Sequence, residues 1–278
     1  MHRFSVLMSL YSKENPQFLR ESLQSVFDNT IRPSQVVLIL DGPVGEELKY
    51  VVEYFQKRYS ELEVYPQPIN KGLSTALNVG LEKCRNDIVF RMDTDDVCFP
   101  NRFERILQEY NKNPELEIIG SSTITIDEKG NKGTRISSHP LTQKMIYKKV
   151  WLCPFAHPTV SFRKNAILRV GSYNPHSGPR QDDYELWFRC VAGGLKCMNL
   201  AEPLLYFRLT SGTVQRMSLN VGWWRAKVGL KGSWKCKCSP IAYLGVCLPL
   251  FRACMPSFIQ EWIYRNIRIT VKNLFLSH

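Results

Sequence analysis

The feature that most constrains the fold is an alternation of short apolar runs with amphipathic segments along the first part of the chain. Residues 3–10, 35–40, 62–65 and 87–92 have the length and composition of buried strands. The segments between them carry apolar side chains at helical spacing. This rhythm predicts a doubly wound, mostly parallel sheet with helices packed on it. In such sheets, ligands bind beyond the carboxyl ends of the strands.

Carboxylates gather at two of these predicted strand ends. Asp41 follows the second strand, and Asp93-Thr94-Asp95-Asp96 follows the fourth. Three carboxylates within four residues repel one another unless a cation or hydrogen bonds offset their charge. Oxygen ligands at this density suit Mg²⁺ or Mn²⁺, so we predict a divalent-metal site at this edge of the sheet. A solvated acidic turn or a helix N-cap is the alternative.

The second half of the chain has a different pattern. The alternation ends near residue 125, and residues 127–133 are typical of a hairpin turn or loop. Residues 181–192 predict a helix that begins beside a second acidic pair, Asp182 and Asp183. We therefore expect a differently built second part that contributes carboxylates of its own.

Four motifs in one order carry a family resemblance. They are Asp41, Asn70-Lys71-Gly72, Asp93-Thr94-Asp95-Asp96 and Asp182-Asp183-Tyr184-Glu185-Leu186-Trp187. With this order and spacing, the chain resembles glycosyltransferase family 2 over roughly residues 3–210. The resemblance implies an α/β protein with the A-type glycosyltransferase fold, in which a Rossmann-like nucleotide-binding part joins an acceptor-binding half. It also implies transfer of a sugar with inversion at the anomeric carbon.

The resemblance also implies domain limits. We expect a catalytic domain over residues 1–215, with its nucleotide-binding part at 1–125 and its acceptor part at 126–215. A basic, aromatic-rich helical region at 216–278 would follow it.

Roles for single residues follow from the resemblance as well. The residues implied to bind the donor nucleotide are Tyr11, Asp41, Lys71 and Asp93. Asp95 would bind the Mn²⁺ or Mg²⁺ that bridges the donor diphosphate, and Asp183 would be the catalytic base. Candidates for acceptor or phosphate contacts are His157, Asp182 and Arg208. Structural roles are the alternatives, with Asp182 as the cap of the helix that follows it.

The chemistry of sugar transfer needs such groups. A departing nucleoside diphosphate gains negative charge, which a divalent ion stabilises. The acceptor hydroxyl is a weak nucleophile and needs a base to take its proton. Asp182 and Glu185 lie beside Asp183 in the sequence, and their negative charge would raise its pKa.

The charge of the chain is uneven. Of 37 Lys and Arg residues, eleven lie after residue 202, where Glu261 is the one acid. The same region mixes tryptophans with an apolar run at 241–251, which is interrupted by Pro249 and too short to span a bilayer. We expect it to bind an anionic membrane face. A packed helical appendage with solvated charges is the alternative.

Location and acceptor follow as expectations. The nine cysteines have no zinc or redox spacing, and the N-terminus does not resemble a secretory signal, so we expect a cytoplasmic protein on the inner face of the membrane. Residues 215–217 do not match the Gln-x-x-Arg-Trp motif of processive family members, which favours one sugar per encounter. The resemblance suggests, as the acceptor, a lipid-diphosphate-linked saccharide of O-antigen or capsule assembly. It also suggests a UDP-sugar donor, with galactose, glucose and an N-acetylhexosamine all open.

Three other functions would each explain a part of the sequence. A sugar nucleotidyltransferase needs a Gly-rich loop after the first strand, and residues 9–15 contain no glycine. A nucleic-acid-binding module would use the basic C-terminal region, but it leaves the acidic strand ends unexplained, so we expect no nucleic-acid partner. An inactive scaffold would not need Asp93, Asp95 and Asp183.

Overall fold

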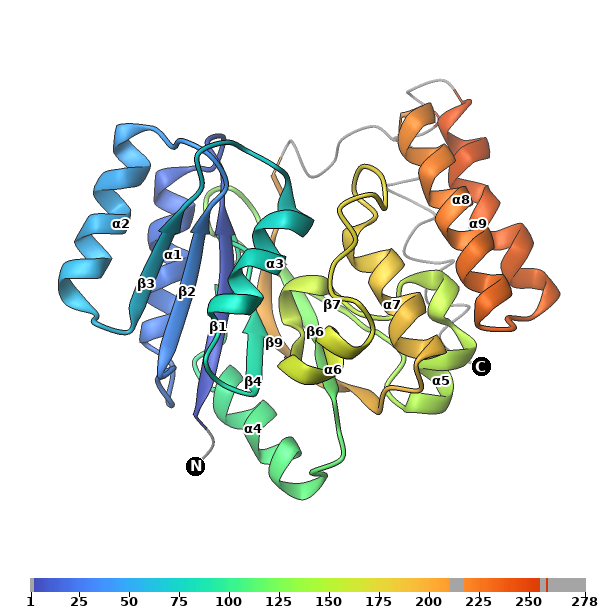
Figure 1. Ribbon diagram of the computed structural model, residues 1–278, viewed down its shortest axis with the longest axis horizontal. Coiled ribbons are helices and arrows are strands. Elements are labelled where there is room, and N and C mark those ends of the chain that lie inside the picture. Colours follow the sequence, from blue (N-terminus) through green and yellow to red (C-terminus); the bar gives the residue numbers. More distant parts are fainter. Residues whose placement is uncertain (1–2, 211–217, 256–258, 260–278) are drawn as a thin grey trace.

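A mixed sheet with helices on both faces forms the body of the protein (Figure 1). The computed structural model describes residues 3–210, 218–255 and 259. Residues 215–217, and Glu261 and Trp262 of the predicted basic region, lie outside the described residues.

The strands follow the predicted rhythm in the first part of the chain, and the later strands pair in both orientations: β6 is parallel to β9 but antiparallel to β7 and β8. The strands are β1 (Phe4–Leu10), β2 (Gln35–Leu40), β3 (Leu62–Pro66), β4 (Ile88–Arg91), β5 (Val97–Cys98), β6 (Ile118–Ile126), β7 (Lys132–Ser137), β8 (Ser161–Arg163) and β9 (Cys197–Arg208). Their order across the sheet is β3-β2-β1-β4-β8-β6-β9-β5, with β7 paired to β6.

Helices connect and cover these strands. They are α1 (Pro16–Phe27), α2 (Glu46–Arg58), α3 (Leu73–Lys83), α4 (Arg102–Lys112), α5 (Gln143–Lys148), α6 (Lys164–Arg169), α7 (Asp182–Ala192), α8 (Leu219–Lys235) and α9 (Pro240–Ala253), with 3₁₀ helices η1 (Val150–Leu152) and η2 (His157–Thr159). No helix among the described residues has the length and hydropathy that a membrane crossing requires.

Strand β1 lies between two parts of the hydrophobic core. Its side chains alternate between the sheet faces, so Val6 and Met8 pack with α1, α2 and α4, whereas Leu7 packs with α3 and α7. All of these side chains are fully buried. Helices therefore pack on both faces of this central strand, and its carboxyl end lies at the edge of the sheet.

The predicted parallel half is confirmed. Strands β3, β2, β1 and β4 are mutually parallel, whereas β8 is antiparallel to both β4 and β6. The register pairs Leu10 with Leu40, and Leu7 with Arg91. Because of this register, the loops that follow β1, β2 and β4 leave the sheet at the same edge.

Several local predictions are also confirmed. Asn15 caps α1, where its Oδ1 accepts a hydrogen bond of 2.8 Å from the Gln17 amide, and Pro16 is the first helical residue. The expected turn at 127–133 joins β6 to β7. The helix expected at 181–192 spans Asp182–Ala192.

The C-terminal helices α8 and α9 form a hairpin, which we call the C-terminal hairpin (residues 218–255), that packs on α7 (Figure 1). A Cβ on Gly245 would overlap the ring of Trp151, so α9 lies in direct contact with η1. Pro249, which interrupts the apolar run in the sequence, lies inside α9. Packing of α9 against α8 and η1 outweighs the lost backbone hydrogen bond.

Gly80 offers a test of how closely α3 packs on the sheet. A Cβ at this position would overlap Leu7 Cδ1 and lie 3.1 Å from Ile39 Cγ1, both in the buried core between α3 and the sheet. Gly80→Ala should therefore destabilise the protein by about 1–3 kcal/mol through overpacking, although alanine is favoured over glycine in a free helix by about 1 kcal/mol.

Urea unfolding checks this expectation. The exposed Glu82 on the same helix supplies the control, because Glu82→Ala should change the free energy of unfolding by about 0.5 kcal/mol or less. An unchanged or increased stability of Gly80→Ala would contradict the close approach of α3 to β1 and β2.

Candidate active site

Asp41 ties two loops together at the carboxyl edge of the sheet. Its side chain is 4% exposed and accepts hydrogen bonds from the Lys71 amide at 2.8 Å and the Gly72 amide at 3.0 Å. Gly72 has a φ of +86°, which an L side chain rarely adopts. Asp41 therefore fixes the loop that carries the Lys71 side chain, which is exposed, and leads into α3.

Three carboxylates meet at the end of β4. One oxygen from each of Asp93, Asp95 and Asp96 lies within 4.8 Å of the others. Asp96 is buried and the other two are partly exposed. We call these three residues the acidic cluster. Asp93 forms an ion pair with the buried Arg91, which comes from the strand itself.

The electrostatics of the acidic cluster fit a bound cation. Burial, together with the negative charges of Asp93 and Glu14, raises the pKa of Asp95 to about 7. Burial and the neighbouring carboxylates also raise the pKa of Asp96 well above its usual range. A divalent ion would offset this repulsion, and carboxylate oxygens are the ligands that Mg²⁺ and Mn²⁺ prefer. The residues present therefore suit such an ion.

Tyr11 and Glu14 complete this edge from the loop after β1. The Thr94 hydroxyl donates a hydrogen bond of 2.9 Å to Glu14 Oε2. Burial raises the pKa of Tyr11, and the charges of Glu14 and Asp95 add to the increase, so the phenol lies close to the acidic cluster. Glu14 was not among the predicted site residues, although it follows a strand whose carboxyl end faces the site.

Arg208 supports the acidic cluster from β9. Its side chain is 1% exposed, its Nε donates to the Asp95 carbonyl at 2.7 Å, and its backbone amide donates to Asp96 Oδ1 at 2.8 Å. The guanidinium also donates to Glu21 Oε2 at 2.5 Å and to the Asp127 carbonyl at 3.1 Å. These contacts give Arg208 a structural role in shaping the loop, and its contact with phosphate stays a prediction.

Asp182 and Asp183 lie in the first turn of α7. Asp182 Oδ1 accepts a hydrogen bond from the Ser74 hydroxyl of α3. The alternative role of Asp182 as a helix cap is wrong, because Gln181 holds the cap position and Asp182 is the first helical residue. Ser74 lies two residues after Gly72, which binds Asp41. The first turn of α3 thus joins the loop that Asp41 fixes to the acidic start of α7.

Asp183 is partly enclosed. Its Oδ1 accepts from the Tyr184 amide at 2.7 Å, and its Oδ2 lies 3.5 Å from Cys153 Sγ. Burial raises the pKa of Asp183, the positive charge of Arg225 lowers it, and Asp182 adds a smaller increase of the expected sign. Glu185, the other expected neighbour, binds Arg189. Arg225 comes from α8 and was missed, because the tryptophans and lysines around it indicate a surface helix.

His157 lies in the core of the second half of the chain. Its side chain is buried, and its Nε2 shares a hydrogen bond of 2.9 Å with the Tyr173 hydroxyl. Burial lowers the pKa of His157 well below its usual value, and the nearby charge of Arg91 lowers it further. The imidazole is therefore neutral at pH 7, and its contact with an acceptor stays a prediction.

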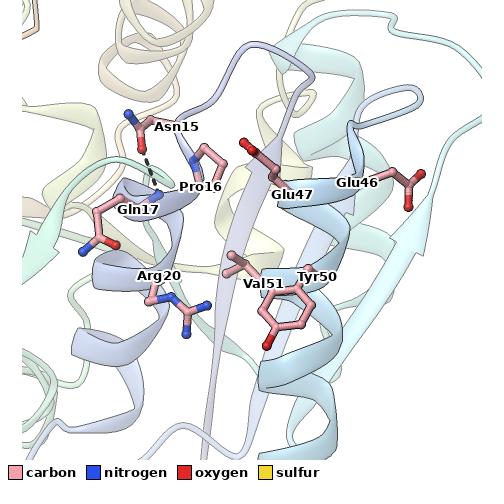
Figure 2. A pocket seen from close by; sticks show the side chains of 8 residues that line it. All are labelled: Asn15, Pro16, Gln17, Arg20, Glu46, Glu47, Tyr50 and Val51. Atoms are coloured by element: carbon pink, nitrogen blue, oxygen red, sulfur yellow. Dashed lines mark hydrogen bonds between the residues drawn. The ribbon is translucent and has the colours of Figure 1, made fainter.

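A separate hollow lies between α1 and α2 (Figure 2). It has a volume of about 710 Å³, and its lining includes Arg20, Glu46 and Tyr50. None of the predicted site residues lines it. We therefore place the candidate active site at the strand ends and not in this hollow.

Comparison with known proteins identifies the family of the chain. The pattern of glycosyl transferase family 2 matches residues 5–171. A UDP-Gal:alpha-D-GlcNAc-diphosphoundecaprenol beta-1,3-galactosyltransferase from Escherichia coli is 37% identical over 77% of this chain and 77% of its own length. The amylovoran biosynthesis glycosyltransferase AmsE from Erwinia amylovora is 37% identical over 82% of this chain and 86% of its own length.

A solved structure shares the fold. S. aureus TarS 1–349 in complex with UDP-GlcNAc has a TM-score of 0.67 at 12% identity, and the match covers 98% of this chain and 78% of TarS 1–349. This likeness confirms the predicted A-type glycosyltransferase fold with C-terminal helices. With the family match and the two bacterial relatives, the chain belongs to glycosyltransferase family 2, as an enzyme related to those that build bacterial surface polysaccharides.

Proposed function

We propose that the protein transfers one hexose, with inversion, from a UDP-sugar to a lipid-diphosphate-linked saccharide during O-antigen or capsule assembly. One observation carries the proposal: α3 joins the loop of Asp41, beside the acidic cluster, to the acidic start of α7. A nucleotide diphosphate and an acceptor hydroxyl could then meet between two sets of carboxylates. The two sets have different tasks, metal binding and proton transfer.

The relatives support the choice of substrates. The name of the E. coli relative pairs UDP-galactose with a diphosphoundecaprenol-linked acceptor. At 37% identity over most of both chains, a donor and an acceptor of the same chemical class are the simplest expectation. Galactose, glucose or an N-acetylhexosamine is the sugar that we propose.

The donor would lie along the ends of β1, β2 and β4. Both carboxylate oxygens of Asp41 hold backbone amides, so Asp41 would act by shaping the nucleotide loop. The exposed Lys71 ammonium would face the phosphates, and Tyr11 and Asp93 would contact the nucleoside. Asp95, with Asp93 and Asp96, would hold Mn²⁺ or Mg²⁺, which supplies positive charge to the departing diphosphate.

The acceptor side would supply the base. Asp183 would accept the proton of the acceptor hydroxyl as its oxygen attacks the anomeric carbon, while the bond to the diphosphate breaks on the opposite side. This in-line geometry inverts the anomeric configuration. Asp182, held by Ser74, would orient the acceptor, and neutral His157 would line the same side.

The C-terminal hairpin would bring the enzyme to its lipid-linked acceptor. Its largest exposed apolar side chains are Leu219, Trp223, Trp234, Ile241, Leu244, Leu248 and Phe251. Residues 218–255 contain six Lys or Arg residues and no acid. Apolar side chains flanked by bases suit the headgroup region of an anionic bilayer, so we propose peripheral binding at the inner face of the cell membrane. Nucleic acid would match the charge but not the apolar side chains.

Substitution of the metal ligand and of the base tests the chemistry. Asp95→Ala and Asp183→Asn should each lower sugar transfer by about 100-fold or more, because one weakens charge stabilisation and the other removes the proton acceptor. Release of UDP by purified protein, with Mn²⁺ and a lipid-diphosphate-sugar mimic, measures transfer. Calorimetry should show weaker metal-dependent UDP binding for Asp95→Ala and unchanged binding for Asp183→Asn.

Asp28→Asn is the matched control, because Asp28 is an exposed carboxylate at the end of α1 and should keep full activity. Equal transfer in EDTA and in Mn²⁺ would refute the metal role. Wild-type transfer by Asp183→Asn would refute its role as the base.

Sedimentation with lipid vesicles tests membrane binding. Trp234 and Leu244 are 78% and 73% exposed, so Trp234→Glu and Leu244→Glu should fold normally. The affinity of the double variant for vesicles that contain phosphatidylglycerol should fall at least about tenfold, because the variant loses two apolar side chains and gains two negative charges. Wild-type binding should also fall with added salt.

Leu168→Glu supplies the control, since Leu168 is 42% exposed on α6, away from the hairpin. Equal binding of the double variant and the wild type would exclude the hairpin as the membrane contact. Tighter binding to RNA than to vesicles would favour a nucleic-acid partner instead.

A further inference from the structure

Helix α8 of the C-terminal hairpin lies in close contact with α7, which carries Asp183. A Cβ on Gly229 would lie 3.0 Å from the Tyr184 hydroxyl, and a Cβ on Gly232 would overlap the ring of Phe188. These two glycines allow the helices to touch where larger residues would separate them. The position of α8 relative to the start of α7 is therefore set by close packing.

Arg225 lies one turn before Gly229 and reaches the first turn of α7. Its guanidinium carbon is 4.0 Å from the centre of the Tyr184 ring, and its Nη1 donates a hydrogen bond of 3.5 Å to Gln181 Oε1. Gln181 and Tyr184 lie on either side of Asp183 in the sequence. The guanidinium thus spans the segment of backbone that carries the proposed base.

Several groups from different elements act on Asp183. Cys153 approaches it from the segment after η1, Asp182 precedes it on α7, and the phenol of Tyr173 lies near it. Asp182 disfavours the charged carboxylate, as does burial. Arg225 supplies the opposing positive charge. A carboxyl group must be deprotonated to accept a proton, so the positive charge of Arg225 bears directly on the proposed reaction.

We propose that Arg225 is a positioning residue: from the C-terminal hairpin, it fixes the charged carboxylate of Asp183 for proton transfer. The acceptor side is then complete only when the hairpin is docked on α7. This inference rests on the proposed role of Asp183 as the base.

The same helix also supports the loop before α7. The ring of Trp224, next to Arg225, lies where a Cβ on Gly178 would be, and Gly178 has a φ of +89°. The neighbouring Trp223 is 57% exposed on the outer side of α8. One turn of α8 therefore carries Trp223 for the proposed bilayer contact, Trp224 for the loop before α7 and Arg225 for the proposed base. The proposed membrane contact and the proposed positioning of Asp183 thus both depend on α8.

The pH dependence of kcat/KM tests the role of Arg225. Arg225→Gln removes the charge that lowers the pKa of Asp183, so that pKa should rise and the acidic limb of the profile should move up by about one pH unit. Below the limb, kcat/KM should fall about tenfold relative to wild type, and the difference should shrink at alkaline pH. Arg225→Lys keeps the charge and should keep the limb near its wild-type position while kcat falls a few-fold.

Lys57→Gln is the control, because it removes one positive charge from an exposed position on α2, outside the candidate site and the C-terminal hairpin, and should leave the profile unchanged. UDP binding and the thermal midpoint report on folding. If Arg225→Gln does not fold, Arg225→Lys decides: a kcat and limb equal to those of Lys57→Gln would overturn the inference.

Asp183→Asn separates this inference from the proposed function. Loss of transfer in Asp183→Asn with a wild-type profile in Arg225→Gln would overturn the role of Arg225 alone. Retained transfer in Asp183→Asn would overturn the assignment of the base, and the inference with it.

Discussion

Repulsion among the carboxylates of Asp93, Asp95 and Asp96 is the constraint on which the rest of the site depends. Acidic groups this close at a partly buried edge persist only where fixed donors and positive charge offset them. Arg91 pairs with Asp93, and Arg208 donates to the Asp95 carbonyl and the Asp96 carboxylate. The protein thus holds the cluster in one arrangement while leaving Asp93 and Asp95 partly exposed, as the proposed binding of a cation requires.

The first turn of α3 then relates this edge to the acceptor side. The Gly72 amide donates a hydrogen bond to Asp41, and the Ser74 hydroxyl donates one to Asp182. This short segment therefore connects the loop fixed by Asp41 to the start of α7. Close contact of α3 with the sheet at Gly80 keeps that turn in place. The C-terminal hairpin adds a third support through Arg225. The proposed base is therefore positioned from the donor side and from the proposed membrane-binding side of the same molecule.

The parallel half of the sheet was predictable because its signals are local: apolar runs of strand length, helical spacing and acids at strand ends. The long strand β9 was not predicted, because it pairs with β6, about 80 residues earlier, and such pairing leaves no local pattern. Asp41 was predicted at the site, but its bonds to backbone amides depend on a loop conformation. Arg225 was missed because only the packing of α8 on α7 brings it to Gln181, which lies 44 residues earlier, and to Tyr184.

In the proposed complex, a divalent ion at the acidic cluster binds the diphosphate of the donor. Anomalous diffraction from crystals grown with Mn²⁺ and UDP measures this most directly. We expect one manganese peak about 2.2 Å from a carboxylate oxygen of Asp95 and from diphosphate oxygens, with the nucleoside beside Tyr11 and Asp41. Manganese or UDP bound elsewhere, such as in the hollow between α1 and α2, with the acidic cluster left empty, would contradict the account.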